Sequence, residues 1–236
     1  MNRNHMFNNA PNRVLKEINR KIAFHEAGHA AAIYLGNKQK KLPPVFFQIY
    51  ITPLQSDFSA SEFNGKTDQK SMAKVEGGRL IHTLPSSIEE ATSGFTLAQT
   101  LAYQRAFEAD IINLLVGPLA EAHYIALRDG ENINPVLVNL NAIHNYGGTS
   151  DLACVNEYLN CFINTAERRE EKVMELFLAA FSFVNDRSNW RAITTLAEYI
   201  LAGEKTIIEC DEIITVLETG RGLPVSDKAM DCRYRY

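Results

Sequence analysis

The 236-residue chain contains no apolar run near the roughly 18 consecutive residues that a membrane-spanning helix needs. Its richest apolar stretches are interrupted by His25, Glu26 and His29, and by the pair Gly117-Pro118. It also lacks an excess of positive charge, since 24 Lys and Arg stand against 28 Asp and Glu. We therefore expect neither a membrane span nor a broad nucleic-acid-binding face.

Cysteine is scarce, and its spacing suggests no redox or structural metal motif. The four cysteines include no C-x-x-C pair. The polar, Asn-rich segment 1–12 has no apolar core of the kind that a secretory signal peptide carries. We expect reduced thiols in a cytoplasmic protein. The chain also lacks the G-x-x-x-x-G-K-[ST] loop, so we expect no ATP-driven chemistry within it.

What the chain does have is apolar residues at helical spacing over most of its length. This pattern predicts one domain with a mainly α (α+β) fold and polar tails at 1–12 and 221–236. The predicted helices cover residues 13–35, 97–127, 151–164, 167–183, 190–201 and 211–218. Gly117-Pro118 is expected to bend the second of these helices or to divide it.

A small β-sheet or hairpin is predicted beside the helices. β-branched and aromatic residues predict a strand at 45–51, and a second strand is predicted at 78–84. Phe47 and Ile49 of the first strand are candidates for holding an extended substrate by edge-strand hydrogen bonding. The alternative for these two residues is a half-buried core strand. Turn-rich segments predict loops at 55–69, 85–94 and 129–148.

The sharpest motif is His25-Glu26-Ala27-Gly28-His29, which matches H-E-x-x-H inside the first predicted helix. A spacing of four residues places both imidazoles on one helical face, where they can bind a single Zn²⁺. Glu26 can then reach a zinc-bound water and act as the general base of peptide hydrolysis. The alternative is a pair of surface or core histidines that bind no metal.

A catalytic zinc site normally uses three protein ligands, so the two histidines need a partner. The extension H-E-x-x-H-x-x-G-x-x-H is absent, and no Glu lies on the next turns of the helix. The third ligand must therefore come from far along the chain. Surface or core positions are expected for His5, His82 and His123.

Four sequence blocks resemble the FtsH-type peptidases, the protease half of membrane-tethered AAA+ zinc proteases. Residues 22–30 resemble the family's zinc-binding helix, and residues 115–121 resemble its helix with the sequence Gly-Gly-Arg-Ala-Ala-Glu. Residues 147–152 resemble its Gly-Ala-Ser-Asn-Asp-Leu segment, and residues 193–217 resemble its C-terminal helices. The four blocks follow in the family's order. The resemblance assigns 13–220 to one FtsH-like peptidase domain, within which 56–99 matches poorly. Gly117-Pro118 stands where the family has Gly-Arg.

The resemblance implies a helical zinc-peptidase domain in which Asp151 joins His25 and His29 as the third zinc ligand. Asp151 stands at the start of a predicted helix capped by Thr149 or Ser150, where an Asp can also serve the helix alone. His144 is its main rival as the third ligand.

The resemblance also implies that Glu121 lies near the site as a partner of a ligand histidine, the alternative being a solvated helix Glu. The implied function is a zinc-dependent metalloendopeptidase that hydrolyses peptides or unfolded proteins, with Glu26 activating the zinc-bound water.

A different class of function stays open, namely a non-proteolytic zinc-binding module that acts in protein interaction or assembly. The intact Glu26 argues against it, because a structural zinc site needs no general base. The family's usual chain carries a transmembrane anchor and an ATPase module, and we expect neither here. A homo-oligomer and a separate ATPase partner are both left open.

Overall fold

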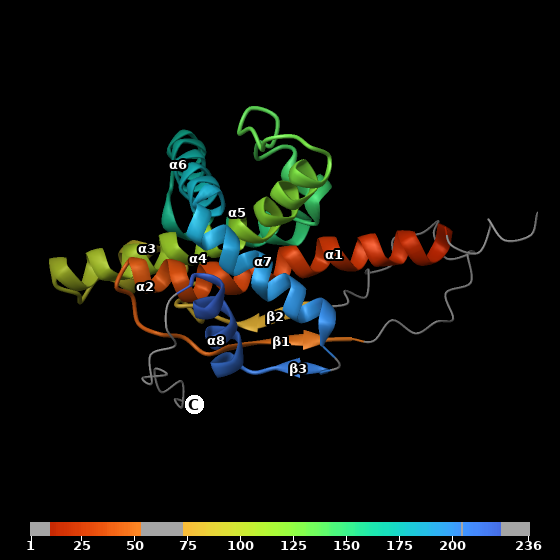
Figure 1. The fold of residues 1–236 in the computed structure, drawn as a ribbon. Helices are drawn as coiled ribbons and strands as arrows, with labels where there is room; N and C mark the ends of the chain where they lie inside the picture. The colour runs from red at the N-terminus through yellow and green to blue at the C-terminus, as the bar shows by residue number, and fades with distance from the viewer. Residues whose placement is uncertain (1–9, 53–72, 204, 223–236) are drawn as a thin grey trace, which may run out of the picture.

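The computed structural model of the protein describes residues 10–52, 73–203 and 205–222 (Figure 1). It confirms the mainly α (α+β) fold, in which helices accompany a small three-stranded antiparallel sheet. Within these ranges no helix combines the length and the apolarity needed to cross a membrane. Most of both predicted tails, much of the predicted loop and insertion around 53–72, and His5 lie outside the described residues.

The helices form where the apolar periodicity predicts them. Helix α1 (Ala10–Ala31) begins within the predicted N-terminal tail and continues through a π-helical turn (Ala32–Gly36) into the short α2 (Asn37–Gln39). The remaining helices are α3 (Ile88–Ala91), α4 (Leu97–Arg128), α5 (Thr149–Phe162), α6 (Ala166–Asn185), α7 (Arg187–Ala202) and α8 (Cys210–Gly220). Helix α3 and a 3₁₀ turn (Ile143–Tyr146) lie within segments predicted as loops.

Helices α1 and α4 pack against each other at the centre of the molecule. Gly28 permits their close approach, because a Cβ at this position would lie 2.7 Å from the Ala120 Cβ and 2.9 Å from the Val116 carbonyl oxygen. Figure 1 shows α1 running between the sheet on one side and helices α5 and α6 on the other. The turn of α1 around Gly28 therefore lies where segments distant in the sequence meet.

Helix α4 is one continuous helix, so the predicted division at Gly117-Pro118 does not occur. Thr96 begins it with a capping box, in which Gln99 Oε1 accepts the Thr96 N–H at 2.8 Å. Pro118 costs one helical hydrogen bond, but the helix around it is buried on several sides. Packing of that apolar surface stabilises the helix through the proline.

The sheet has the order β2-β1-β3, with β1 (Phe47–Ile51) at the centre, β2 (Ala73–Gly77) at one edge and β3 (Ile207–Ile208) at the other. The predicted second strand at 78–84 is wrong. The strand ends at Gly77, and the chain turns there because Gly77 and Gly78 both have positive φ. The apolar residues that suggested a strand pack against the helices instead, with Ile81 buried.

The central position of β1 also corrects the prediction for Phe47 and Ile49. Both side chains are buried, and Ile49 pairs with Val75 of β2 on one side and with Ile208 of β3 on the other. Because Ile49 is paired on both sides, the strand has no free edge there to which a peptide could add. The alternative, a strand whose side chains belong to the core, is therefore correct for Phe47 and Ile49. The edge strand β2 contacts α1, the helix that carries His25 and His29.

Candidate metal centre

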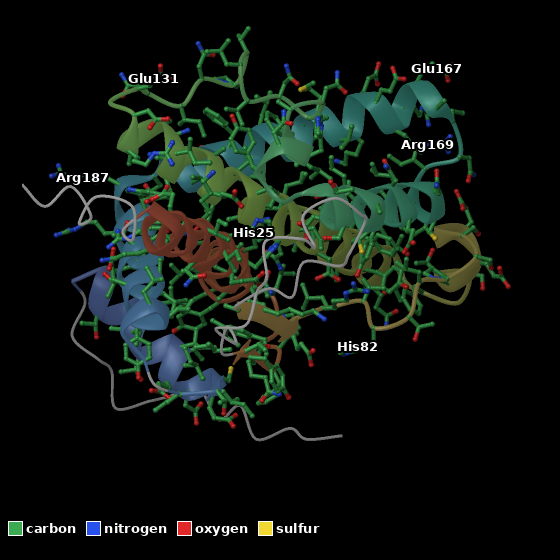
Figure 2. All side chains as sticks on the ribbon, turned by 90° about the vertical axis from the view of Figure 1, so that its right-hand side faces the viewer. His25, His82, Glu131, Glu167, Arg169 and Arg187 are labelled. Atoms are coloured by element: carbon green, nitrogen blue, oxygen red, sulfur yellow. The ribbon has the colours of Figure 1, made fainter. Side chains whose placement is uncertain are left out.

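His25 and His29 of α1 meet Asp151 of α5 in the interior of the molecule. The Nε2 atom of His25 lies 3.3 Å from Asp151 Oδ2, and the Nε2 atom of His29 lies 3.4 Å from Asp151 Oδ1. All three side chains are about nine-tenths buried, with exposed fractions of 10%, 12% and 12%. The three residues form a buried group that could hold a metal ion. Figure 2 shows His25 on the inner part of α1 beside β2, with His82 and Arg187 away from it.

The donor atoms of the three residues lie close enough together to surround one metal ion. One ligand atom from each residue can be chosen so that all three lie within 4.8 Å of one another. The 3.3 Å separation joins His25 to Asp151 Oδ2, whereas the 3.4 Å separation joins His29 to Oδ1. With metal–ligand bonds of about 2.0 to 2.1 Å, neighbouring ligand atoms of a tetrahedron lie about 3.3 to 3.4 Å apart. Two imidazoles and one carboxylate would also leave a fourth position free for water or substrate. The same donor set suits ferrous iron, so the geometry by itself does not name the metal.

The hydrogen bond of His29 defines which of its nitrogens faces Asp151 as an acceptor. Its Nδ1 atom lies 2.8 Å from the Asn113 carbonyl oxygen, which can only accept, so Nδ1 carries the proton. In the neutral ring Nε2 is then a bare acceptor that points at a carboxylate oxygen. Two apposed acceptors repel each other unless a proton or a cation lies between them. The site is therefore built to hold positive charge.

His25 has a carboxylate on each side of its ring. Its Nδ1 atom lies 3.4 Å from Glu121 Oε2, while its Nε2 atom faces Asp151. Burial lowers the pKa of His25, but contacts with Asp151 and Glu121 outweigh burial and raise that pKa to about 10. Burial likewise raises the pKa of Asp151, yet its interactions with His29 and His25 outweigh burial and bring that pKa below its usual value. A carboxylate behind a ligand histidine fixes the ring and strengthens it as a metal ligand.

Two buried atoms of this group have no hydrogen-bond partner among the described residues: His25 Nδ1 and Asp151 Oδ2. A buried acceptor without a partner costs about 1 to 3 kcal/mol. A cation between the rings and Asp151 Oδ2 would satisfy that oxygen and would let His25 Nδ1–H turn fully toward Glu121. The residues present therefore fit a bound divalent metal ion.

Asp151 is the third residue of α5, close to the predicted position. The predicted cap is wrong, however, because the helix begins at Thr149 after Gly148, and no side chain caps it. The negative charge of Asp151 lies in the first turn, where it interacts favourably with the helix dipole. The ionised form that a metal ligand needs is thus favoured by the backbone as well as by the two histidines.

Gly117 makes room for His29 where α1 crosses α4. A Cβ at position 117 would lie 2.3 Å from His29 Nε2 and 2.4 Å from His29 Cε1, well inside van der Waals contact. The imidazole thus occupies the space of the side chain that Gly117 lacks. The sequence block that contains Gly117 also provides Glu121, one turn further along the same helix.

Glu26 belongs to the same cavity but not to the group of three. Its Oε2 atom accepts the backbone N–H of Val75 at 2.6 Å, on the side of β2 that no described strand pairs. The cavity has a volume of about 1110 Å³ and is lined by Glu26, both site histidines, Glu121 and Asp151. A smaller, mostly apolar cavity of about 270 Å³ beside α2 and α8 contains none of these residues.

The other histidines do not join the group. His144 lines the cavity but is exposed and lies outside the cluster with His25, and His82 is exposed on the surface. His123 is buried and stacks on Trp190 with ring centroids 4.1 Å apart. The structure therefore brings Asp151, and not His144, to the two histidines of the motif.

Two contributions to the site were not predicted, and both come from backbone groups. The Asn113 carbonyl holds His29, and the Val75 N–H holds Glu26. Neither group has a signature in the amino-acid sequence, since every residue carries a carbonyl and almost every residue an N–H.

No family model, curated protein or solved structure matches this chain.

Proposed function

We propose that this protein is a zinc-dependent metalloendopeptidase that hydrolyses peptide bonds of peptides or unfolded proteins. The observation that carries the proposal is the buried group of His25, His29 and Asp151, which could hold a metal ion, in one cavity with Glu26, which lies outside that group. The H-E-x-x-H spacing and the block order that resembles FtsH-type peptidases favour zinc and peptide hydrolysis.

In this proposal each side chain has a distinct role. Bound Zn²⁺ would polarise the peptide carbonyl and lower the pKa of a water molecule. Glu26 removes a proton from the attacking water and passes it to the leaving nitrogen. Glu121 and the Asn113 carbonyl hold the rings of His25 and His29 by their Nδ1 atoms, so that both Nε2 atoms face the metal position.

The edge of β2 that faces the cavity supports a peptide as substrate. Val75 has its N–H directed into the cavity and away from β1, where Glu26 accepts it, and both Val75 and Gly77 line that cavity. An extended peptide can add to such an edge through main-chain hydrogen bonds, which read no side chain, when Glu26 releases the Val75 N–H. Unfolded segments present the extended backbone that this mode of binding requires, whereas folded domains do not.

One observation favours the non-proteolytic alternative. The hydrogen bond from Val75 N–H gives Glu26 a structural role, because it ties α1 to the edge of β2. A zinc-binding module that acts only in assembly could retain Glu26 for this contact alone. The deciding experiment must therefore remove the base and keep the contact.

Glu26→Gln does this, since the amide oxygen of Gln still accepts the Val75 N–H while the side chain no longer takes up a proton. We expect wild type to bind about one zinc and to cleave unfolded casein in a zinc-dependent way. Glu26→Gln should bind the same amount of zinc and lose nearly all cleavage, by a factor of about 10² or more. Glu170→Gln, an exposed Glu on α6, is the matched control and should cleave normally.

Two results would contradict the peptidase proposal. One is full activity of Glu26→Gln, and the other is a zinc-loaded wild type that cleaves neither casein nor a mixed peptide library. The second result would favour the assembly module, provided that zinc binding itself is observed.

A further inference from the structure

The carboxylates that line the cavity are all engaged by groups of the protein. Asp110 accepts the N–H groups of Leu80 and Ile81, each at 2.9 Å, and the Tyr158 hydroxyl at 3.1 Å. Glu26 accepts the N–H of β2, and the two remaining carboxylates face the site histidines. None of these groups is available to pair with a basic side chain of a substrate without the loss of an existing contact.

Three cations line the same cavity: Lys21, Lys74 and Arg79. Lys74 pairs with Glu76 at 3.5 Å, but their side chains are 65% and 50% exposed, so this pair contributes little. Among the described residues, neither Lys21 nor Arg79 has a carboxylate within 4 Å. Arg79 is close enough to Asp110 to oppose the rise that burial causes in the pKa of that carboxyl, but Asp110 is already hydrogen-bonded to other groups. Because the whole chain has a net charge of −4, this group of cations is a local feature of the cavity.

Arg79 is held in place by its neighbours along the chain. The N–H of Gly78 donates to the Phe46 carbonyl at 2.9 Å, and the N–H of Leu80 donates to Asp110 at 2.9 Å. A Cβ at Gly78 would lie 2.4 Å from Ile33 Cδ1, so the backbone there is closely packed. The backbone of Arg79 is therefore held in place just after the end of β2.

The guanidinium of Arg79 reaches across the cavity toward α5. Its Nη2 atom lies 3.9 Å from the Sγ atom of Cys154, a weak contact that leaves most of its donors free. Cys154 lies three residues after Asp151, on the same face of α5. The free donors of Arg79 are thus about one helical turn from the metal centre, at the end of the strand edge.

From this arrangement we infer that the cavity prefers acidic peptides, and that Arg79 is the main determinant of this preference. An Asp or Glu side chain of the bound peptide pairs with Arg79 while the adjacent backbone lies along β2, and Lys21 and Lys74 add a more general attraction. A guanidinium offers a carboxylate two parallel hydrogen bonds, which a lysine cannot do. The inference rests on the proposed function, because it names the substrate class of that site.

The experiment measures peptide binding and not cleavage, so that it does not depend on catalysis. Three fluorescein-labelled peptides of about ten residues can extend along β2 and across the cavity; they are identical except for two central positions, which are Glu, Gln or Lys. Binding is measured by fluorescence anisotropy to full-length Glu26→Gln protein with Zn²⁺ added. We expect the Glu peptide to bind about tenfold more tightly than the Gln peptide, as a charge-assisted pair does.

Variants then assign the preference to Arg79. Arg79→Gln should bring the Glu/Gln ratio close to one, and Arg79→Glu should favour the Lys peptide. The control is Arg187→Glu, which makes the same charge change at an exposed position that lies away from His25 in Figure 2. It should leave the ratio unchanged. Circular dichroism and zinc content confirm that each variant is folded.

Three outcomes would overturn the inference: equal affinity for the Glu and Gln peptides, no binding of the Glu peptide at about 1 mM, or a ratio that Arg187→Glu changes as much as Arg79→Glu does. Failure of the proposed function gives a different result. If the protein selects Glu peptides through Arg79 but wild type never cleaves them, the peptidase proposal is refuted and the acidic-peptide site stands. If wild type cleaves peptides without a charge preference, the peptidase proposal stands and the acidic-peptide site is refuted.

Discussion

Asp151 combines two roles, as a charge at the start of α5 and as the residue that faces both motif histidines. The roles separate in Asp151→Asn, which keeps the side-chain volume and removes the charge. We expect zinc affinity to fall by about tenfold or more, since one of three ligands is weakened. The free energy of unfolding of the metal-free protein should change by only about 1 kcal/mol. Zinc titration with a competing chelator and urea unfolding measure the two effects.

The control for Asp151 is His144→Ala, which changes the histidine that sequence reasoning left as its rival. His144 is exposed and outside the cluster, so zinc affinity should stay the same within a factor of about two. Loss of zinc from His144→Ala together with retention in Asp151→Asn would show that the site is assembled differently.

His123 should make the protein less stable in acid. Burial lowers its pKa from 6.5 to about 4, and its Nδ1 atom has no partner among the described residues. Between pH 6.5 and about 4, His123 binds a proton in the unfolded chain but stays neutral in the native chain. The free energy of unfolding is therefore unaffected by His123 above pH 6.5 and decreases as the pH drops toward 4. The loss should approach about 3 kcal/mol, since each pKa unit corresponds to about 1.4 kcal/mol.

His123→Phe tests this prediction, because Phe can keep the stacking on Trp190 and cannot titrate. Urea unfolding at pH values near 7 and near 4.5 should show a smaller acid-induced loss in the variant than in wild type. An identical loss in both proteins would mean that other groups cause the pH dependence.

At the scale of elements, the crossing of α1 and α4 depends on Gly117. Gly117→Ala places a Cβ 2.3 Å from His29 Nε2, so either the ring or the helix must move. We expect zinc affinity to fall about tenfold and the metal-free protein to lose about 1 to 3 kcal/mol, as overpacked sites do. Gly94→Ala is the control, since a Cβ there meets nothing within 4 Å. Equal zinc affinity of Gly117→Ala and wild type would refute this role.

The elements also show what the sequence could predict. Helix α5 was predictable because its apolar residues repeat at helical spacing, and the 25/29 histidine pair because its spacing alone puts both rings on one face. The end of β2 at Gly77 was not, because Ile81 is buried against helix residues, and such burial produces the same apolar signal as burial in a sheet. Asp151 came from the order of sequence blocks, since no local pattern joins residues 122 positions apart (151 − 29). The Asn113 carbonyl came only from the structure.

At the scale of the whole molecule, a bound metal would tie the first long helix to α5. Zinc that binds only the native state should stabilise it by about 4 kcal/mol at a free concentration one thousand times the Kd. Thermal unfolding with zinc and with a chelator measures this as a rise in Tm of several degrees. Glu26→Gln should show the full rise and Asp151→Asn little of it. A rise of the same size in Asp151→Asn would place the metal elsewhere.

The hydrogen bond between Glu26 and Val75 also bears on self-association. An open strand edge is a template on which a second chain can add, and proteins commonly protect such edges with charged groups. Here the carboxylate of Glu26 occupies the N–H that β2 directs into the cavity. The residue proposed as the base thus also keeps the edge of the sheet from joining another copy. Truncation to alanine would uncover that edge and confuse lost chemistry with aggregation, whereas glutamine keeps it covered.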